Sequence, residues 1–173
     1  FVHRLMFPIR DASGRVTGFG GRSLGDDSAK YVNSPATVLF DKSNCLYGLY
    51  QARQAIVAQR VAIVVEGYLD LAAVLDAGFE NVVASLGTAF TAAQARLLAR
   101  YCDRVFFSYD GDAAGATATE RSLDLLLARG FEVRDLYLRP AAMTHAWAAG
   151  YPWEHVAKDY GMGLNLACLQ YVR

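Results

Sequence analysis

The chain has 173 residues, of which 54% are hydrophobic and 20% are charged, and its formal net charge at pH 7 is zero. This composition excludes a disordered segment and fits one compact domain with a buried core. The longest apolar stretches are only as long as strands and fall short of the roughly 18 residues of a membrane-spanning helix. We therefore expect a soluble protein without a membrane partner.

The cysteines and the first residues indicate the cellular compartment of the protein. Cys45, Cys102 and Cys168 lie too far apart for a zinc knuckle or an even set of disulfides, as expected in a reducing cytoplasm. The chain begins with Phe1 and shows no signal-peptide pattern, which favours a cytoplasmic fragment of a longer protein.

The charges are unevenly distributed along the chain. Residues 1–65 hold eight Lys or Arg and four Asp or Glu, whereas residues 66–140 hold seven and eleven. A basic half joined to an acidic half is typical of a protein that holds both a polyanion and divalent cations.

The first part of the chain predicts short β-structure followed by a helix. Residues 6–22 are typical of a β-hairpin that ends in a flexible glycine pair, Gly20 and Gly21. Residues 23–37 contain several turn formers and predict a loop. The spacing of the apolar residues over 47–58 then predicts a helix.

Apolar runs of strand length alternate with helical patterns from about residue 59 onward. Strands that are apolar throughout and alternate with helices are typical of a parallel sheet covered on both faces. We therefore expect an α/β fold, with a parallel sheet flanked by helices and preceded by a small, basic α+β subdomain. The strands are predicted at 61–65, 82–85, 104–109 and 133–138, and the helices at 68–77, 91–101 and 113–129.

Carboxylates follow two of these predicted strands at the point where each strand ends. Glu66 follows VAIVV, Asp110 follows VFFSY, and Asp112 and Asp70 come shortly after them. Because ligands collect beyond the carboxyl ends of parallel strands, we expect these acids at one edge of the sheet. Crowded carboxylates repel one another unless a cation neutralises them, and Mg²⁺ prefers such oxygen ligands. Taken singly, Asp70 or Asp112 is more often a helix cap than a ligand.

The pattern differs from those of other phosphate-binding folds. The G-x-x-x-x-G-K-[ST] motif of P-loop enzymes is absent from the sequence. GFGGR at 18–22 precedes a loop rather than a helix, so it is a weak match to a dinucleotide-binding motif. A phospho-acceptor receiver domain carries a lysine after its final strand, where VRDLYLRP offers only arginines.

With these motifs in view, the chain resembles a known family. EGYLD (66–70), ASLGT (84–88) and YDGDAAG (109–115) resemble the Toprim domain shared by bacterial primases, topoisomerases and some nucleases. The upstream segments resemble the catalytic core of bacterial replicative DNA primases of the DnaG type, and the match extends to about residue 140. These segments are RLMFPIRD (4–11), GRVTGFGGRSL (14–24), KYVNSPAT (30–37) and LYGLYQA (46–52).

The resemblance implies an enzyme that synthesises short RNA primers on single-stranded DNA from ribonucleoside triphosphates, with Mg²⁺ or Mn²⁺ as cofactor. By position, Glu66, Asp110 and Asp112 match the family's catalytic, metal-binding acids, and Asp70 matches the further acid of its first motif. The family also implies contact with a replicative helicase through a C-terminal domain outside this chain. The positions that match the family's template- and nucleotide-binding ridge are Arg22, Lys30, Tyr31, Asn33 and Lys42.

ASLGT is expected to support the site rather than to react. We expect Ser85 and Thr88 to cap the following helix, and Gly87 to allow a tight turn. A nucleophilic role for Ser85 would need a neighbouring base, and the sequence offers none beside it.

The resemblance divides the chain into three predicted parts. Residues 1–58 are the basic template- and nucleotide-binding part, residues 59–140 the Toprim metal-binding domain, and residues 141–173 a divergent tail. No acid occurs between Asp135 and Glu154, where the family carries a further acidic motif of the D-P-D kind. This departure keeps two alternatives open: a catalytically impaired remnant that only binds nucleic acid, and another Toprim enzyme such as a nuclease or topoisomerase.

Overall fold

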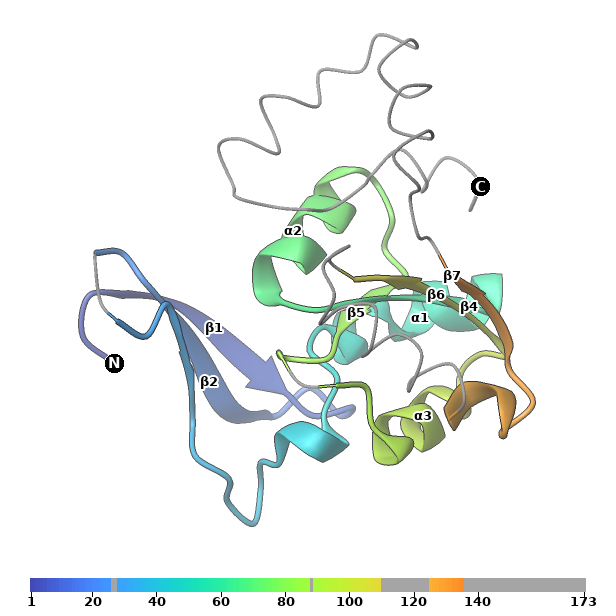
Figure 1. Ribbon diagram of the computed structural model, residues 1–173, viewed down its shortest axis with the longest axis horizontal. Helices are drawn as coiled ribbons and strands as arrows, with labels where there is room; N and C mark the ends of the chain where they lie inside the picture. Colours follow the sequence, from blue (N-terminus) through green and yellow to red (C-terminus); the bar gives the residue numbers. More distant parts are fainter. Residues whose placement is uncertain (26–27, 88, 110–124, 136–173) are drawn as a thin grey trace, which may run out of the picture.

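The computed structural model describes residues 1–25, 28–87, 89–109 and 125–135 (Figure 1). Its strands form a three-stranded antiparallel sheet, β1-β2-β3, and a four-stranded parallel sheet, β5-β4-β6-β7. Residues 125–127 are also helical. The elements are β1 (Arg4–Arg10), β2 (Val16–Ser23), β3 (Tyr31–Asn33), the 3₁₀-helix η1 (Lys42–Asn44), α1 (Leu49–Gln59), β4 (Val61–Val65), α2 (Tyr68–Asp76), β5 (Val82–Ala84), α3 (Ala92–Leu98), β6 (Arg104–Ser108) and β7 (Glu132–Asp135).

The parallel sheet lies between helices on both of its faces (Figure 1). On one face, α1 and α3 share a buried cluster with Val64 of β4 and Phe107 of β6. On the other face, Leu71 and Val74 of α2 pack against Val65 and its neighbours. Successive strand residues point to opposite faces, so all five residues of β4 are buried. The predicted α/β fold with a parallel sheet flanked by helices is confirmed.

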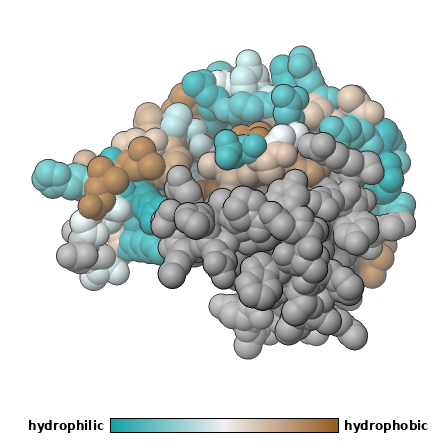
Figure 2. Space-filling model, turned by 90° about the horizontal axis from the view of Figure 1, so that it is seen from above, coloured by the Kyte–Doolittle hydropathy of each residue, from teal (hydrophilic) through white to brown (hydrophobic). Residues whose placement is uncertain are grey.

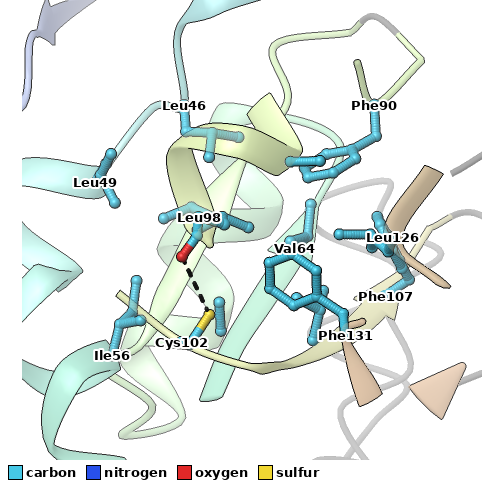
Figure 3. Close-up of a cluster of buried hydrophobic side chains, with 14 of the residues drawn as sticks. Leu46, Leu49, Ile56, Val64, Phe90, Leu98, Cys102, Phe107, Leu126 and Phe131 are labelled. Carbon is cyan, nitrogen blue, oxygen red and sulfur yellow. Dashed lines mark hydrogen bonds between the residues drawn. The ribbon is translucent and has the colours of Figure 1, made fainter. Parts of the chain in front are cut away.

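The larger core cluster joins α1 and α3 to the sheet (Figure 3). Phe107 is fully buried and packs edge-to-face on Phe90, with ring centroids 5.3 Å apart. The Cys102 thiol donates a hydrogen bond to the Leu98 carbonyl at 3.8 Å, and burial raises its pKa to about 11. Cys102 is therefore a protonated core residue, because a reactive cysteine needs a low thiol pKa.

The antiparallel sheet confirms the predicted hairpin but corrects two details. Gly20 and Gly21, expected as a flexible pair, are buried residues of β2 and pair with β1 and β3. A Cβ atom at Gly20 would collide with the Tyr68 ring, so the close approach of α2 requires glycine there. The loop predicted at 23–37 contains β3, whose three residues are too few to show an alternating pattern.

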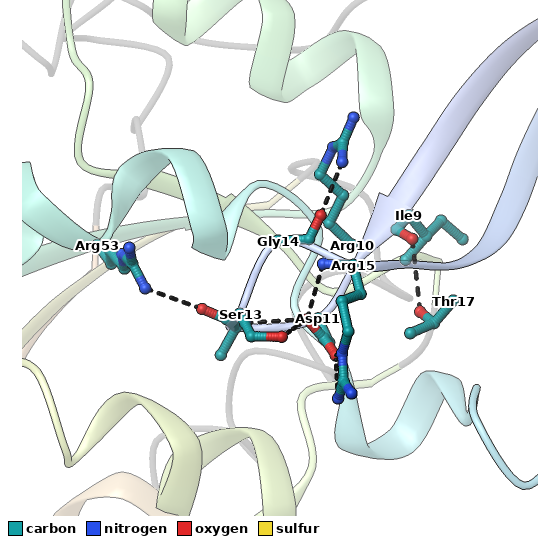
Figure 4. Close-up of polar contacts among 9 residues, drawn as sticks. Ile9, Arg10, Asp11, Ser13, Gly14, Arg15, Thr17 and Arg53 are labelled. Carbon is teal, nitrogen blue, oxygen red and sulfur yellow. Dashed lines mark hydrogen bonds and ion pairs between the residues drawn. The ribbon is translucent and has the colours of Figure 1, made fainter.

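The turn between β1 and β2 is fixed to α1 (Figure 4). The Asp11 carboxylate accepts hydrogen bonds from Ser13 Oγ at 2.6 Å and Arg15 Nε at 2.8 Å. Arg53 of α1 donates to the Ala12 carbonyl at 3.0 Å. Because α1 also packs on the parallel sheet, these bonds set the orientation of the hairpin relative to that sheet.

The predicted bounds agree closely with the structure where both can be compared. The strand at 61–65 has the bounds expected, and the helix expected at 91–101 is shorter, Ala92–Leu98. Most of the helix predicted at 113–129 lies outside the described residues, as do the last residues of the strand predicted at 133–138.

The described surface combines polar and apolar regions (Figure 2). Apolar residues gather over the end of the molecule that β1 and β2 form, where Leu5, Met6 and Phe19 are exposed. Among the helices of the described ranges, none is long and apolar enough to cross a bilayer.

Candidate active site

The order of the parallel strands reverses between β4 and β6. From β4 the chain passes through α2, on one face, to β5, and from β5 it passes through α3, on the other face, to β6. Open α/β sheets bind ligands beyond the carboxyl ends of the strands at such a reversal. Glu66 directly follows β4 at this position.

The Glu66 side chain lies close to the end of β6. Val65 pairs in register with Ser108, so Glu66 is level with Tyr109. The Tyr109 hydroxyl donates a hydrogen bond to Ser85 Oγ at 3.1 Å. Burial raises the pKa of Tyr109, the contact with Ser85 opposes this shift, and the charge of Glu66 adds to it. The charge of Glu66 thus acts on the Tyr109 phenol at the edge where β4 and β6 end.

Asp70 has a capping role in the structure. Its Oδ2 accepts a hydrogen bond from the Gly67 N–H at 2.9 Å, at the start of α2. An acid in the first turn of a helix also interacts favourably with the helix dipole. The function of Asp70 as a metal ligand stays a prediction.

Asp110 and Asp112, the other two predicted metal-binding acids, lie outside the described residues. Within the part that the structure does describe, three or more His, Cys, Asp or Glu side chains do not come close enough together to hold a metal ion. Of the four acids in the predicted cluster, the structure therefore describes Glu66 and Asp70.

Three of the predicted nucleotide-binding residues gather around Tyr68. The Arg22 guanidinium lies 5.9 Å from the centre of the Tyr31 ring, and the Tyr31 and Tyr68 rings are 6.3 Å apart. The Tyr68 hydroxyl donates a hydrogen bond to Asn33 Oδ1. Burial raises the pKa of Tyr31, Arg22 opposes this shift, and Asp70 adds to it. The basic, polar side of β2 and β3 therefore adjoins the acidic EGYLD segment.

The two predicted lysines lie on other segments. Lys30 is exposed just before β3, whereas Lys42 is half-buried at the start of η1. The fully buried Gln94 of α3 donates from Nε2 to the carbonyl oxygens of Lys42, at 3.1 Å, and Cys45, at 2.8 Å. Gln94 thereby ties η1 to the rim of the parallel sheet.

The loop after β5 differs from its prediction. Thr91, not Ser85, is the N-cap of α3, and its Oγ1 accepts from the Gln94 N–H at 3.1 Å. Ser85 continues the strand direction, is fully buried and accepts from Tyr109; Thr88 lies outside the described residues. Gly87 has a φ of 69°, in the left-handed region, as expected for a tight turn.

Two of these residues, Tyr68 and Gln94, were not singled out from the sequence. Tyr68 lies between Glu66 and Asp70 in EGYLD, so a tyrosine between two candidate acids was the available signal. For Gln94 the signal was the pattern T-x-x-Q at 91–94, which is typical of a capping box.

Comparisons with known proteins agree with this arrangement. The family "DNA primase catalytic core, N-terminal domain" matches residues 1–53, and the Toprim-like family matches residues 63–143. The DNA primase of Halalkalibacterium halodurans is 43% identical over 171 residues, which cover 99% of this chain and 28% of the relative. The chain thus spans less than a third of the length of that relative.

Solved primase structures have the same fold. The Escherichia coli primase catalytic core matches with a TM-score of 0.78 and 40% identity, over 99% of this chain and 53% of that chain. A DnaG primase catalytic domain bound to single-stranded DNA matches with a TM-score of 0.74 and 41% identity, over 92% of this chain and 48% of that chain. The chain belongs to the bacterial DNA primases of the DnaG type and carries the part of their catalytic core that contains the Toprim-like domain.

Proposed function

We propose that this chain forms the part of a primase catalytic core that joins ribonucleotides on a single-stranded DNA template. Glu66, Asp110 and Asp112 hold Mg²⁺ or Mn²⁺ in this proposal. The observation that carries it is the position of Glu66, at the reversal between β4 and β6 and level with Tyr109, the residue before Asp110.

The donor set fits a divalent cation. Glu66 is half-buried, its charge adds to the raised pKa of Tyr109, and Asp110 and Asp112 follow this tyrosine in the sequence. Carboxylate oxygens are the ligands that Mg²⁺ prefers, and Mg²⁺ sites are commonly completed by substrate phosphates. Bound there, the cation supplies electrostatic stabilisation for the charge that develops on the transferred phosphoryl group and on pyrophosphate.

The described side chains supply the binding surface for the substrates. Arg22 and Tyr31 lie together on β2 and β3, next to Asp70 of the acidic segment. The Arg22 guanidinium suits bidentate contact with a phosphate, and the Tyr31 ring, 40% exposed, is available to stack on a base. Lys30 and Lys42 add positive charge that attracts both the triphosphate and the template.

A second observation supports the choice of template. A related DnaG catalytic domain of the same fold has been solved bound to single-stranded DNA. Its match extends over 92% of this chain. Binding through phosphates weakens as the salt concentration rises, so template binding by this chain should be salt-dependent.

Template-directed incorporation of ribonucleotides, with Mg²⁺ or Mn²⁺, tests the proposal in wild type and Glu66→Gln. This substitution keeps the size of the side chain and removes its charge, so incorporation should fall by about a hundredfold or more. Glu80→Gln is the matched control, because Glu80 is exposed at the opposite end of the sheet, before β5. Unchanged incorporation by Glu66→Gln would refute the metal site.

A nucleic-acid-binding remnant is the second candidate, favoured by the absence of Asp and Glu from residues 136–153. It requires binding of single-stranded DNA that falls with salt and does not respond to Mg²⁺. Fluorescence anisotropy with a labelled oligonucleotide, with and without Mg²⁺, separates the two candidates. Salt-sensitive binding together with no incorporation by the wild type would favour the remnant.

A further inference from the structure

We infer that Tyr68 is a positioning residue that fixes the side-chain amide of Asn33, so that the Asn33 nitrogen faces an acceptor oxygen of the incoming ribonucleotide. The inference rests on the proposed function and extends it, since it assigns Tyr68 a role that acts through Asn33 and not by contact with the nucleotide. The hydrogen bond from the Tyr68 hydroxyl to Asn33 Oδ1 is its starting point.

The packing around Tyr68 leaves its hydroxyl a single position. Tyr68 is 4% exposed at the start of α2. Its ring stacks on Phe7 at 4.4 Å with an interplanar angle of 8°, and it contacts Tyr47 edge-to-face at 4.6 Å. Gly20 leaves room for this ring against β2, because a Cβ there would overlap it. The phenol is thus held by β1, β2 and the segment before α1.

Asn33, in contrast, lies on an element that provides little support of its own. It is the last residue of β3, a three-residue strand at the edge of its sheet, and its Cα partner is Gly20 of β2. Tyr31 lies two residues earlier, on the same face of the strand, opposite Arg22. A short edge strand fixes its backbone through few hydrogen bonds, so the contact with Tyr68 is what orients the Asn33 side chain.

The orientation decides which chemical group Asn33 presents. An asparagine amide carries an acceptor oxygen and a nitrogen with two N–H donors on opposite sides. With Oδ1 occupied by the Tyr68 hydroxyl, the nitrogen faces away from α2. This nitrogen can donate to a phosphate or ribose oxygen, whereas an outward Oδ1 would repel a phosphate. Arg22, nearby on the same face, favours the anion as well.

Kinetics with conservative variants test the inference. Tyr68→Phe keeps the packed ring and removes only the hydroxyl, so the KM for ribonucleotides should rise about three- to tenfold while kcat stays close to that of the wild type. In an Asn33→Ala background, Tyr68→Phe should raise the KM no further, because the two side chains act through one contact. Tyr47→Phe is the matched control, since it removes a phenolic hydroxyl from the same cluster and leaves the Tyr68–Asn33 bond in place.

Three results, two in KM and one in template binding, would overturn the inference. The first is an unchanged KM in Tyr68→Phe, and the second is an equal rise in Tyr47→Phe, which would mean that packing of the cluster is responsible. The third is a weaker Kd for the single-stranded template with an unchanged nucleotide KM, because the oxygen recognised by Asn33 would then belong to the template.

An NMR measurement separates this inference from the proposed function. The side-chain NH₂ signals of Asn33, assigned by their loss in Asn33→Ala, should shift in Tyr68→Phe and stay in place in Tyr47→Phe. Unmoved signals in Tyr68→Phe would refute the positioning role whatever the activity. If the wild type incorporates no ribonucleotide, the same NMR signals are followed while ribonucleoside triphosphate and Mg²⁺ are added. A shift of the Asn33 NH₂ signals supports presentation of the nitrogen to the nucleotide, and unchanged signals refute it.

Discussion

Replacing Gln94 with Leu should destabilise the protein more than its position on a seven-residue helix suggests. Gln94 is fully buried, and its Nε2 donates to the carbonyls of Lys42 and Cys45 while its Oε1 accepts from the Thr91 N–H at 2.9 Å. Leu has a similar size and preserves apolar burial. The substitution therefore removes hydrogen bonds from a buried side chain without leaving a large cavity.

The magnitude follows from the groups that lose a partner. The Lys42 carbonyl keeps a hydrogen bond from the Cys45 N–H at 3.3 Å, so the main losses fall on the Cys45 carbonyl and the Thr91 N–H. A buried polar group without a partner costs about 1–3 kcal/mol. Because Thr91 is partly exposed, we expect a total loss of about 2–4 kcal/mol, a large part of the about 5–15 kcal/mol by which a domain is stable.

Urea unfolding measures this loss, which should lower the midpoint by about 1–2 M. Gln54→Leu is the matched control, because Gln54 is exposed on α1, and its midpoint should stay near that of the wild type. Hydrogen exchange should also quicken at the Cys45 N–H, which closes η1, and not at Phe107 in β6. Equal midpoints for the two Leu variants would refute the role of Gln94 as a tie between η1 and α3.

The Gln94→Glu variant adds a pH dependence of defined sign. The carbonyls of Lys42, Cys45 and Ser85 surround this position, so the introduced carboxyl must be protonated to donate a hydrogen bond. Its folded-state pKa is then raised above the unfolded value of about 4.3. The contribution of this carboxyl to the free energy of unfolding is fully present below the unfolded pKa and is lost as the pH rises through the folded pKa. A Tm difference from the wild type that did not grow with pH would contradict this reasoning.

Three further substitutions have defined outcomes in thermal unfolding. Gly20→Ala places a Cβ against the Tyr68 ring and should lower the stability by about 1–3 kcal/mol. Phe107→Ala empties a fully buried site and should cost about 3–5 kcal/mol. The third substitution is Asp11→Asn. The pKa of the Asp11 carboxyl is lowered by hydrogen bonds, of which the one from the Ser13 side chain has the largest effect, so the ionised carboxylate stabilises the fold above about pH 3.9. The Tm deficit of Asp11→Asn should therefore shrink as the pH falls below that value.

The parallel sheet was predictable because its signal is local. Residues 61–65 form an uninterrupted apolar run, and the structure gives β4 these same bounds. The position of Glu66 at the rim then followed from the direction of parallel strands. Residues 31–33 carry no such signal, because β3 exists through its pairing with β2 and not through its own sequence.

The contacts that organise the candidate site join segments far apart in the chain. Tyr68 and Asn33 are 35 positions apart, and Gln94 and Cys45 are 49 apart. Spacing rules relate residues within one helix or strand, so they do not reveal such pairs. The same limit explains Ser85, which follows β5 and resembled a helix cap in the sequence. In the structure it accepts a hydrogen bond from Tyr109, which follows β6 on the other side of β4.

Residues that follow the strands of the parallel sheet contact the segments that carry Asn33 and Lys42. From the connection after β4, Tyr68 bonds to Asn33, and from the connection after β5, Gln94 bonds to the backbone of η1, which carries Lys42. Ile9 and Phe40 of the basic part also share a buried cluster with Tyr68 and Leu86. Residues from both sides of the predicted division at residue 58 therefore pack together in this cluster, and the division itself stays a prediction. A change on either side should reach the other through these contacts, which join the surface proposed to bind nucleotides to the edge proposed to bind the metal ion.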